Sequence, residues 1–256
     1  MDLGLNGKRA LVLGASRGLG MAIAQSLAAE GATVFAAARS VDKITGWSAG
    51  MDNVRPVKLD LADLASVDSV VNDLLAEGGV DIIVNNSGGP PPGTAQDADR
   101  GAWITHFESM AANVFHLTTR LLPAMKARGW GRVISITSSG VEQPIPNLAL
   151  SNGIRAAVVG WSKTLASEVA GDGITVNVVM PGRIHTERVD ELDAAAAKRT
   201  QSDVTEVAAK SRATIPAGRY GKPGEFADVV TFLASERASY VTGSRIRIDG
   251  GAIKSI

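Results

Sequence analysis

A glycine-rich turn near the start of the chain is the first place where residue types and spacing suggest chemistry. The apolar run 11–13 leads into Gly14, Gly18 and Gly20, which form the pattern G-x-x-x-G-x-G, and helix-forming residues follow. Free amides at a helix N-terminus bind anions, and glycines without a β-carbon let a phosphate approach the backbone closely. The pattern therefore predicts a phosphate-binding turn, and the alternative is a tight turn whose glycines serve packing alone.

A strand and a helix must position this turn, and the same alternation continues along the chain. Near-continuous apolar strands that alternate with amphipathic helices are typical of a parallel sheet covered on both faces. The longest predicted helix, residues 100–128, is expected to be interrupted or to end near Pro123. The predicted strands span residues 9–13, 33–38, 54–59, 80–84, 131–137, 174–180 and 245–248, and the other predicted helices span residues 21–27, 64–75, 150–169 and 224–234.

Residues that could bind a ligand gather directly after the predicted strands. In a doubly wound sheet the ligand binds outside the carboxyl ends of the strands, so these residues are expected to share one edge. No internal repeat or linker interrupts the alternation, which predicts a single domain over residues 1–256. The residues at the strand ends are Gly14–Gly20, Arg39, Asp60, Asn86, Ser138 and Pro181.

The composition excludes several kinds of site and partner. The chain has 26 Lys and Arg against 26 Asp and Glu, which gives no electrostatic reason to expect nucleic acid or an anionic membrane as partner. The absence of cysteine excludes disulfides, thiolate metal sites and cysteine nucleophiles, and no metal is expected. No apolar run approaches the ~20 residues that span a bilayer, and the first residues lack the layout of a signal peptide. We expect a cytoplasmic protein with a small-molecule substrate.

The segment 186–215 departs from the alternation of strands and helices. It is polar and charged with an alanine-rich middle, and it predicts one or two helices without a strand. An insertion at the ligand edge is suited to a substrate lid, so the lid is expected at about residues 186–215. A solvated helical excursion is the alternative.

In the order and spacing of its motifs the chain resembles the short-chain dehydrogenase/reductase family, in particular its 3-oxoacyl-carrier-protein reductase-like branch. Leu13 and Ser87 stand where threonine and alanine are common. The resemblance implies an α/β, single-domain, doubly wound (Rossmann) sheet of seven parallel strands with helices on both faces. It also implies a nicotinamide cofactor and a homo-oligomer, either a tetramer or a dimer. The motifs that carry the resemblance are the Gly14/Gly18/Gly20 loop, Asp60, Asn85-Asn86-Ser87-Gly88, Asn113, Ser138, Pro181-Gly182-Arg183-Ile184 with Thr186, and Asp249-Gly250-Gly251.

The resemblance also assigns residues to the cofactor. An arginine after the second strand accommodates the 2′-phosphate of NADP, whereas an acidic residue there selects NAD. Arg39 follows that strand, and we expect Arg39 and Arg17 to converge on this phosphate, while Asp42 caps the next helix. NADP(H) is therefore favoured, and NAD is the alternative. The implied cofactor-binding residues are Gly14, Ser16, Arg17, Gly18, Leu19, Gly20, Arg39, Asp60, Leu61, Asn86, Ser87, Gly88, Arg155, Pro181, Gly182, Ile184 and Thr186.

The catalytic residues that the resemblance implies are Asn113, Ser138, Ser151 and Arg155. The family uses a serine that hydrogen-bonds the substrate oxygen, a tyrosine that exchanges the proton, a lysine one turn later and an asparagine that holds a relay water. Asn113 and Ser138 match the asparagine and the serine, but Ser151 replaces the tyrosine and Arg155 replaces the lysine. Because Ser151 and Arg155 are four residues apart, they share a helix face. An aliphatic hydroxyl is a poor acid, and a guanidinium does not readily pass on a proton.

Three functions follow from this altered pair. The chain is a reductase of carbonyl or hydroxyl substrates, 3-oxoacyl compounds among them, whose proton comes from His185, Glu142 or a water held by Ser151. Alternatively, the hydride goes to a cationic imine that needs no strong acid. In the third reading the protein binds NADP(H) without turnover, as a sensor or a partner subunit. Retention of Asn113 and Ser138 favours an enzyme.

Overall fold

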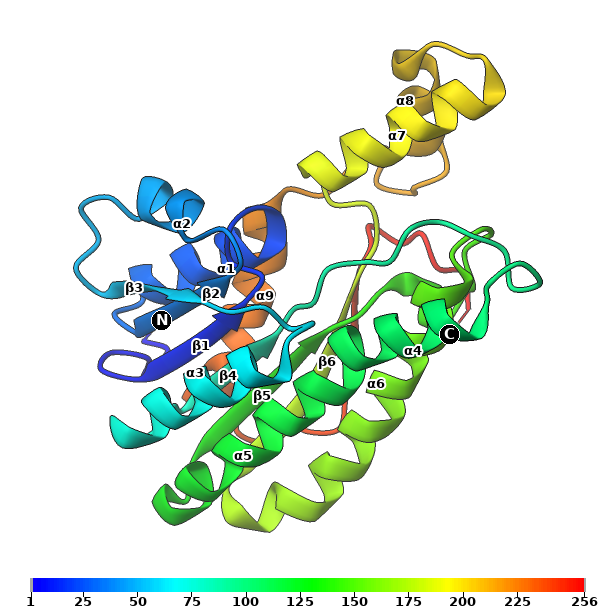
Figure 1. Ribbon diagram of the computed structural model, residues 1–256. Helices are drawn as coiled ribbons and strands as arrows, with labels where there is room; N and C mark the ends of the chain where they lie inside the picture. Colours follow the sequence, from blue (N-terminus) through cyan, green and yellow to red (C-terminus); the bar gives the residue numbers. More distant parts are fainter. Residues whose placement is uncertain (1, 256) are drawn as a thin grey trace.

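The computed structural model describes residues 2–255, which form one parallel sheet between two layers of helices (Figure 1). The order of the seven strands is β3-β2-β1-β4-β5-β6-β7, and it reverses between β1 and β4, where doubly wound sheets bind their ligands. The predicted fold is therefore confirmed, and the strand ends differ from the predicted ones by at most two residues. The strands are β1 (Arg9–Leu13), β2 (Thr33–Ala38), β3 (Val54–Lys58), β4 (Ile82–Asn85), β5 (Gly131–Ile136), β6 (Ile174–Pro181) and β7 (Arg245–Ile248).

Each strand supplies apolar side chains to both helical layers because successive residues point to opposite faces of a sheet. On β1, Ala10 and Val12 pack into the core beneath α1 (Gly18–Ala29), α2 (Val41–Trp47) and α9 (Pro223–Ala234). Leu11 and Leu13 pack into the opposite core beneath α3 (Leu64–Ala76), α5 (Asn113–Arg128) and α6 (Ala149–Val169). Burial on both faces explains why the central strands read as continuous apolar runs.

The long helix predicted over residues 100–128 is interrupted, but not at Pro123. It consists of α4 (Arg100–Phe107), a π-helical turn (Glu108–Ala112) and α5, which continues through Pro123. Pro123 is exposed, so the backbone bond that it lacks lies on the outer side of the helix. The prediction of a break at Pro123 was wrong, and the π turn shifts the side chains that follow it relative to a regular α-helix.

The segment after β6 forms two helices without a strand, as predicted. These are α7 (Glu187–Thr200) and α8 (Val204–Ala213), which project from the body of the molecule, in yellow in Figure 1. Asp203 begins α8 by accepting a hydrogen bond from the Thr205 amide at 2.8 Å. Within residues 2–255, no helix is both long enough and apolar enough to cross a membrane.

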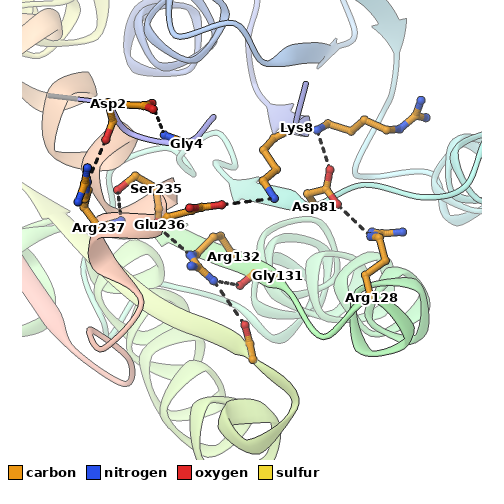
Figure 2. A network of polar contacts seen from close by, with 12 residues as sticks. Asp2, Gly4, Lys8, Asp81, Arg128, Gly131, Arg132, Ser235, Glu236 and Arg237 are labelled. Atoms are coloured by element: carbon orange, nitrogen blue, oxygen red, sulfur yellow. Dashed lines mark hydrogen bonds and ion pairs between the residues drawn. The ribbon is translucent and has the colours of Figure 1, made fainter. Parts of the chain in front are cut away.

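A buried arginine ties the sheet to the helices at the amino ends of the strands (Figure 2). Arg132 on β5 is 2% exposed, and its Nε donates to the Ser235 carbonyl after α9 at 3.1 Å. Its Nη1 donates to the Gly131 carbonyl at 2.8 Å, and burial lowers the pKa of Arg132. Lys8 reaches Glu236 at 4.0 Å in the same network. Because these contacts lie at the edge opposite the predicted crevice, they serve the stability of the fold.

Candidate active site

The glycine turn closes tightly on itself and on the neighbouring strand end. Gly14 has a φ of +64°, and a β-carbon there would lie 2.6 Å from the Asn86 carbonyl oxygen. A β-carbon at Gly20 would collide with the Gly14 carbonyl. Helix α1 begins at Gly18, inside the motif and three residues before the predicted start at Met21. The glycines are therefore required for packing as well as for the approach of a ligand.

The first turn of α1 fits a dinucleotide phosphate. Its N-cap residue, Arg17, makes no side-chain capping bond, so no side chain occupies the amides that open the helix. Ser16 and Leu19 flank this turn and are half-buried. At the end of β5, the Thr137 hydroxyl is buried without a hydrogen-bond partner among the described residues, and it directly precedes Ser138. An unpartnered hydroxyl and free amides at one strand edge are features of a site that receives a polar ligand.

Asparagine and aspartate side chains organise the loops after β3 and β4. Asn86 Nδ2 donates to the Leu13 carbonyl at 3.2 Å, which holds the ends of β1 and β4 together. Asp60 Oδ1 accepts from the Ala62 amide at 3.0 Å and so shapes the loop that contains Leu61. Ser87 and Gly88 follow Asn86 toward α6. The structure thus places these predicted residues at the carboxyl edge of the sheet.

The two arginines predicted to bind a 2′-phosphate have different surroundings in this structure. The Arg17 guanidinium pairs with Glu187 at 2.5 Å and with Glu191 at 3.2 Å, and these bonds raise its pKa. Arg39 is exposed after β2 and lines a cavity of about 760 Å³ together with Asp60, whereas Arg17 is not part of that lining. The convergence of Arg17 and Arg39 on a 2′-phosphate stays a prediction, and in this structure the carboxylates of α7 hold Arg17.

Asp42 does not cap α2 in the predicted manner. The helix begins at Val41, its N-cap residue is Ser40, and no side chain makes a capping hydrogen bond. Asp42 lies one residue inside the first turn, where a negative charge is favourable toward the helix dipole. The acidic residue nearest to the end of β2 therefore belongs to the helix, and Arg39 is the charged residue that follows the strand directly.

Ser151 and Arg155 form a hydrogen-bonded pair on α6. Arg155 Nε donates to Ser151 Oγ at 3.3 Å, Nη1 donates to the Ile136 carbonyl at 3.0 Å, and Nη2 reaches the Gly88 carbonyl at 3.5 Å. These contacts attach α6 to the ends of β5 and β4. Burial, with a smaller effect of the Arg188 charge, lowers the pKa of Arg155 to about 10. The guanidinium therefore stays protonated at neutral pH.

Ser138 lies at the end of β5, and its hydroxyl oxygen accepts from the Gly140 amide at 3.0 Å. This bond caps the short helical turn Ser139–Val141. The hydroxyl hydrogen is not used by that contact, so Ser138 can still donate to a substrate oxygen.

Asn113 is not brought to Arg155. Its Nδ2 donates to the Leu61 carbonyl at 2.8 Å, which ties α5 to the loop after β3. A small cavity beside Arg155 is lined by Met110 and Val114 from the same helical stretch. Met110 of the π turn and Val114 therefore lie beside Arg155, and a relay water held by Asn113 stays a prediction.

The two candidate proton donors have other partners. His185 Nε2 lies 3.2 Å from Asp190 Oδ1, and both side chains are exposed. Glu142 lies between Arg245 and Arg247 of β7, at 3.7 and 3.4 Å. Neither side chain has Ser151 or Arg155 among its hydrogen-bond or ion-pair partners.

The loop after β6 leads into α7 and touches the glycine turn. The Gly182 amide donates to the Ile248 carbonyl at 2.9 Å beyond Pro181, and a β-carbon at Gly182 would lie 2.7 Å from the Asp249 Cα. Ile184 is buried, and Thr186 would lie 3.6 Å from a β-carbon at Gly18. The first turn of α7 is therefore packed against the glycine turn.

Three functional features escaped the sequence reasoning. Met110 lines the small cavity beside Arg155, and the charge of Arg188 on α7 contributes to the lowered pKa of Arg155. In the lid, Arg183 pairs at 2.8 Å with Asp193, a carboxylate that is only 4% exposed. Tyr220 Oη donates to the other oxygen of Asp193 at 2.7 Å. The charged residues of a polar helix do not reveal these contacts in the sequence, because their partners come from other segments of the chain.

Comparisons with known proteins agree with this architecture. Residues 14–252 match a family model described as Enoyl-(Acyl carrier protein) reductase. The 3-oxoacyl-[acyl-carrier-protein] reductase FabG of Escherichia coli (strain K12) is 39% identical over 253 residues, which cover 97% of this chain and 98% of the relative.

Solved structures are similar over the whole chain. L-sorbose reductase from Gluconobacter frateurii, complexed with NADPH and L-sorbose, has a TM-score of 0.94 and 35% identity, with 100% of both chains covered. YwfH, an NADPH-dependent reductase involved in bacilysin biosynthesis, has a TM-score of 0.91 and 28% identity, with 98% of this chain and 100% of YwfH covered.

Proposed function

Because the chain belongs to the short-chain dehydrogenase/reductase family, a family of oxidoreductases, we propose that it transfers a hydride between NADP(H) and a carbonyl or hydroxyl group of a small substrate. Candidate substrates are ketones, 3-oxoacyl thioesters and imines. The proposed enzyme is a single domain with a lid at residues 186–215, acts in the cytoplasm and forms a homo-oligomer.

The proposed cofactor site uses the carboxyl edge of the sheet. When bound, NADPH supplies the hydride. The glycine turn and the first amides of α1 would hold the pyrophosphate, and Arg39 would hold the 2′-phosphate. The loops 86–88 and 181–186 would enclose the nicotinamide end. The structural relatives solved with NADPH support NADP(H) as the cofactor of this site.

The observation that carries the proposal is the contact of Arg155 with Ser151 at 3.3 Å. Ser151 Oγ accepts from Arg155, so its own hydrogen is available to a substrate oxygen or to a bound water. Arg155 supplies fixed positive charge where the oxygen becomes negative, and such preorganised charge lowers the barrier. Ser138 would donate a second hydrogen bond to the same oxygen.

Binding of NADP(H) without turnover is the second candidate. It is favoured by the engagement of His185 with Asp190 and of Glu142 with two arginines, which leaves the site without a protonated side chain of suitable acidity. The two candidates differ in one measurable respect, the consumption of NADPH.

The decisive assay saturates the protein with NADPH and follows loss of the reduced cofactor with ketones, 3-oxoacyl thioesters and imines. We expect turnover of at least one class above the rate without protein. Tight NADPH binding with no turnover across all three classes would establish the binding protein instead.

The double variant Ser151→Tyr with Arg155→Lys tests the altered pair directly. A phenol beside an ammonium group is a better proton donor than a serine beside a guanidinium, so we expect ketone reductase activity to appear or to rise. Each single variant serves as a control, because a phenol or an ammonium group alone restores half of the pair. No gain in the double variant would contradict the idea that this pair limits the chemistry.

A further inference from the structure

We propose that the substrate carries a carboxylate, which Arg155 binds together with Arg188 of α7. This inference rests on the proposed function for the claim that the bound acid is reduced or oxidised. The ligand class is an oxo acid or the corresponding hydroxy acid. We call Arg155, Arg188 and Ser151 the carboxylate subsite.

Arg155 is the cation of the crevice that lacks an acidic partner. Within residues 2–255, none of the ion pairs includes Arg155, and its three hydrogen bonds go to two backbone carbonyls and the Ser151 hydroxyl. A guanidinium has five N–H donors, so two remain for a ligand. A half-buried cation with neutral neighbours and free donors favours a bound anion, and a planar fork of donors matches a carboxylate.

Helix α7 brings a second guanidinium to this place. Glu187 and Glu191 both bind Arg17 of the glycine turn, and the first turn of α7 therefore lies at the crevice. Arg188 lies between these two glutamates in sequence, pairs with Glu191 at 3.2 Å, and its charge acts on Arg155. The guanidiniums of Arg17 and Arg188 are thus paired with the two glutamates of α7, whereas Arg155 has no carboxylate partner among the described residues.

Apolar side chains complete the environment of Arg155. Met110, Val114, Ile136 and Val158 line the small cavity beside it, together with the polar side chains of Asn85 and Ser87. Apolar neighbours exclude water and strengthen an ionic hydrogen bond relative to the same bond at the surface. A neutral analogue would offer the two free N–H groups of Arg155 weaker acceptors than a carboxylate does, which lowers its binding free energy. The subsite therefore discriminates between acids and their neutral analogues.

The binding experiment uses benzoate and benzamide, which have similar shapes but differ in charge, titrated calorimetrically into the protein saturated with NADP⁺. We expect benzoate to bind at least about tenfold more tightly than benzamide. Arg155→Met should weaken benzoate by roughly 10- to 100-fold and leave benzamide unchanged. Arg188→Met should weaken benzoate by roughly 2- to 5-fold, because Arg188 is exposed. Arg199→Met, in the last turn of α7, is the matched control and should have no effect.

The affinity for NADPH, measured by cofactor fluorescence, separates the subsite from a role in holding the cofactor. Equal binding of benzoate and benzamide to the wild-type protein would overturn the proposal, and this comparison needs no variant. Loss of NADPH affinity in Arg155→Met with benzoate binding unchanged would also overturn it. Arg155→Lys, which keeps the charge, should retain part of the benzoate affinity.

The activity experiment compares 2-, 3- and 4-oxo acids with their methyl esters. We expect the acids to have a kcat/KM at least about tenfold higher, mainly through KM, because the carboxylate is bound equally before and during hydride transfer. Reduction of the esters but not the acids would overturn the carboxylate subsite while leaving the reductase function intact. Arg155-dependent benzoate binding without turnover of any compound would support the subsite and refute the reductase function.

Discussion

At the scale of the residue, the proposed function depends on a cation that binds without giving up a proton. Arg155 is held by two backbone carbonyls and a serine, and it remains charged at neutral pH although burial lowers its pKa to about 10. A fixed charge of this kind stabilises negative charge on oxygen, and in the proposed function the proton comes from Ser151 or from water. Stabilisation of charge and supply of the proton are therefore separate tasks here.

Arg39 gives a prediction about the cofactor at the same scale. Replacing Arg39 with Asp removes a cation at the end of β2 and adds an anion that would repel a 2′-phosphate. We expect the ratio of the NADH and NADPH dissociation constants to move toward NADH by roughly 10- to 100-fold, measured by fluorescence titration. Arg55→Asp, on the same cavity but paired with Glu77 at 3.0 Å, is the control. An unchanged ratio in Arg39→Asp would remove Arg39 from the phosphate site.

At the scale of the element, short polar contacts determine where helix α9 begins and attach helix α7 to the body of the molecule. Helix α9 starts where Glu225 accepts from the Lys222 amide at 2.7 Å and from Arg219 at 2.6 Å. Helix α7 is held to the body through Arg17, whose partners are two glutamates on successive turns. These contacts are exposed, so they direct local structure more than they add to global stability.

Glu225 predicts a pH dependence for α9. The hydrogen bond from Arg219 comes first among the causes that lower the pKa of Glu225 to about 2, from an ordinary value of 4.5. A lowered pKa means that the ionised carboxylate stabilises the folded state above pH 4.5 and that this contribution is lost as the pH falls to about 2. We expect the Tm difference between the wild type and Glu225→Gln to shrink across this range in thermal melts. Arg219→Gln should reduce the same difference, and a Tm difference independent of pH would contradict the assignment.

The contact of α7 with Arg17 predicts a local change without a global one. In Glu187→Gln with Glu191→Gln, the Arg17 guanidinium loses both ionic partners. Because the pairs are exposed, we expect an unchanged Tm but faster amide hydrogen exchange over residues 187–200. Glu206→Gln, which removes an ion pair within α8, is the matched control and should leave that exchange unchanged. Equal exchange in the double variant and the wild type would show that the glutamates do not hold the lid.

At the scale of the whole molecule, the two ends of the sheet have different tasks. The carboxyl ends of the strands carry glycines, hydroxyls and unpaired donors, whereas the amino ends carry the satisfied network around Arg132 (Figure 2). Arg132 also reaches the Gly173 carbonyl at 3.4 Å, so one side chain joins β5, the turn before β6 and the end of α9. Stability at one edge leaves the opposite edge free for ligand binding.

The variant Arg132→Met tests whether the amino edge of the sheet serves stability independently of ligand binding at the carboxyl edge. The substitution fills much of the space but leaves the buried carbonyls of Gly131 and Ser235, and the Gly173 carbonyl of a part-buried bond, without their donor. We expect the free energy of unfolding to fall by about 2–4 kcal/mol, measured by urea denaturation, with the cofactor affinity of the folded protein unchanged. Arg237→Met, at an exposed position of the same network, should change the free energy of unfolding by less than about 0.5 kcal/mol. A similar loss in both variants would contradict the special role of the buried arginine.

Local patterns in the sequence were sufficient to predict the parallel sheet. Strands of five or six mainly apolar residues, as in β1 and β5, are buried on both faces. Their apolar composition predicts this burial directly. The glycine turn and the polar residues after each strand were predictable for the same reason, since the parallel arrangement brings all carboxyl ends to one edge. The site edge therefore followed from the chain order alone.

The directions of individual side chains followed only from the tertiary structure. The π turn at Glu108–Ala112 turns Met110 toward Arg155 and leaves Asn113 to bind the Leu61 carbonyl. The Arg17 guanidinium pairs with the glutamates of α7, and Arg39 takes no part in these pairs. The sequence by itself determined the sheet, its ligand edge and the replacement of a phenol and an ammonium group by Ser151 and Arg155. Only the tertiary structure decided which charged side chains pair at that edge, because packing brings together segments that are far apart in the chain. An ion pair depends on the distance between two side chains in space, and local sequence periodicity does not contain that distance.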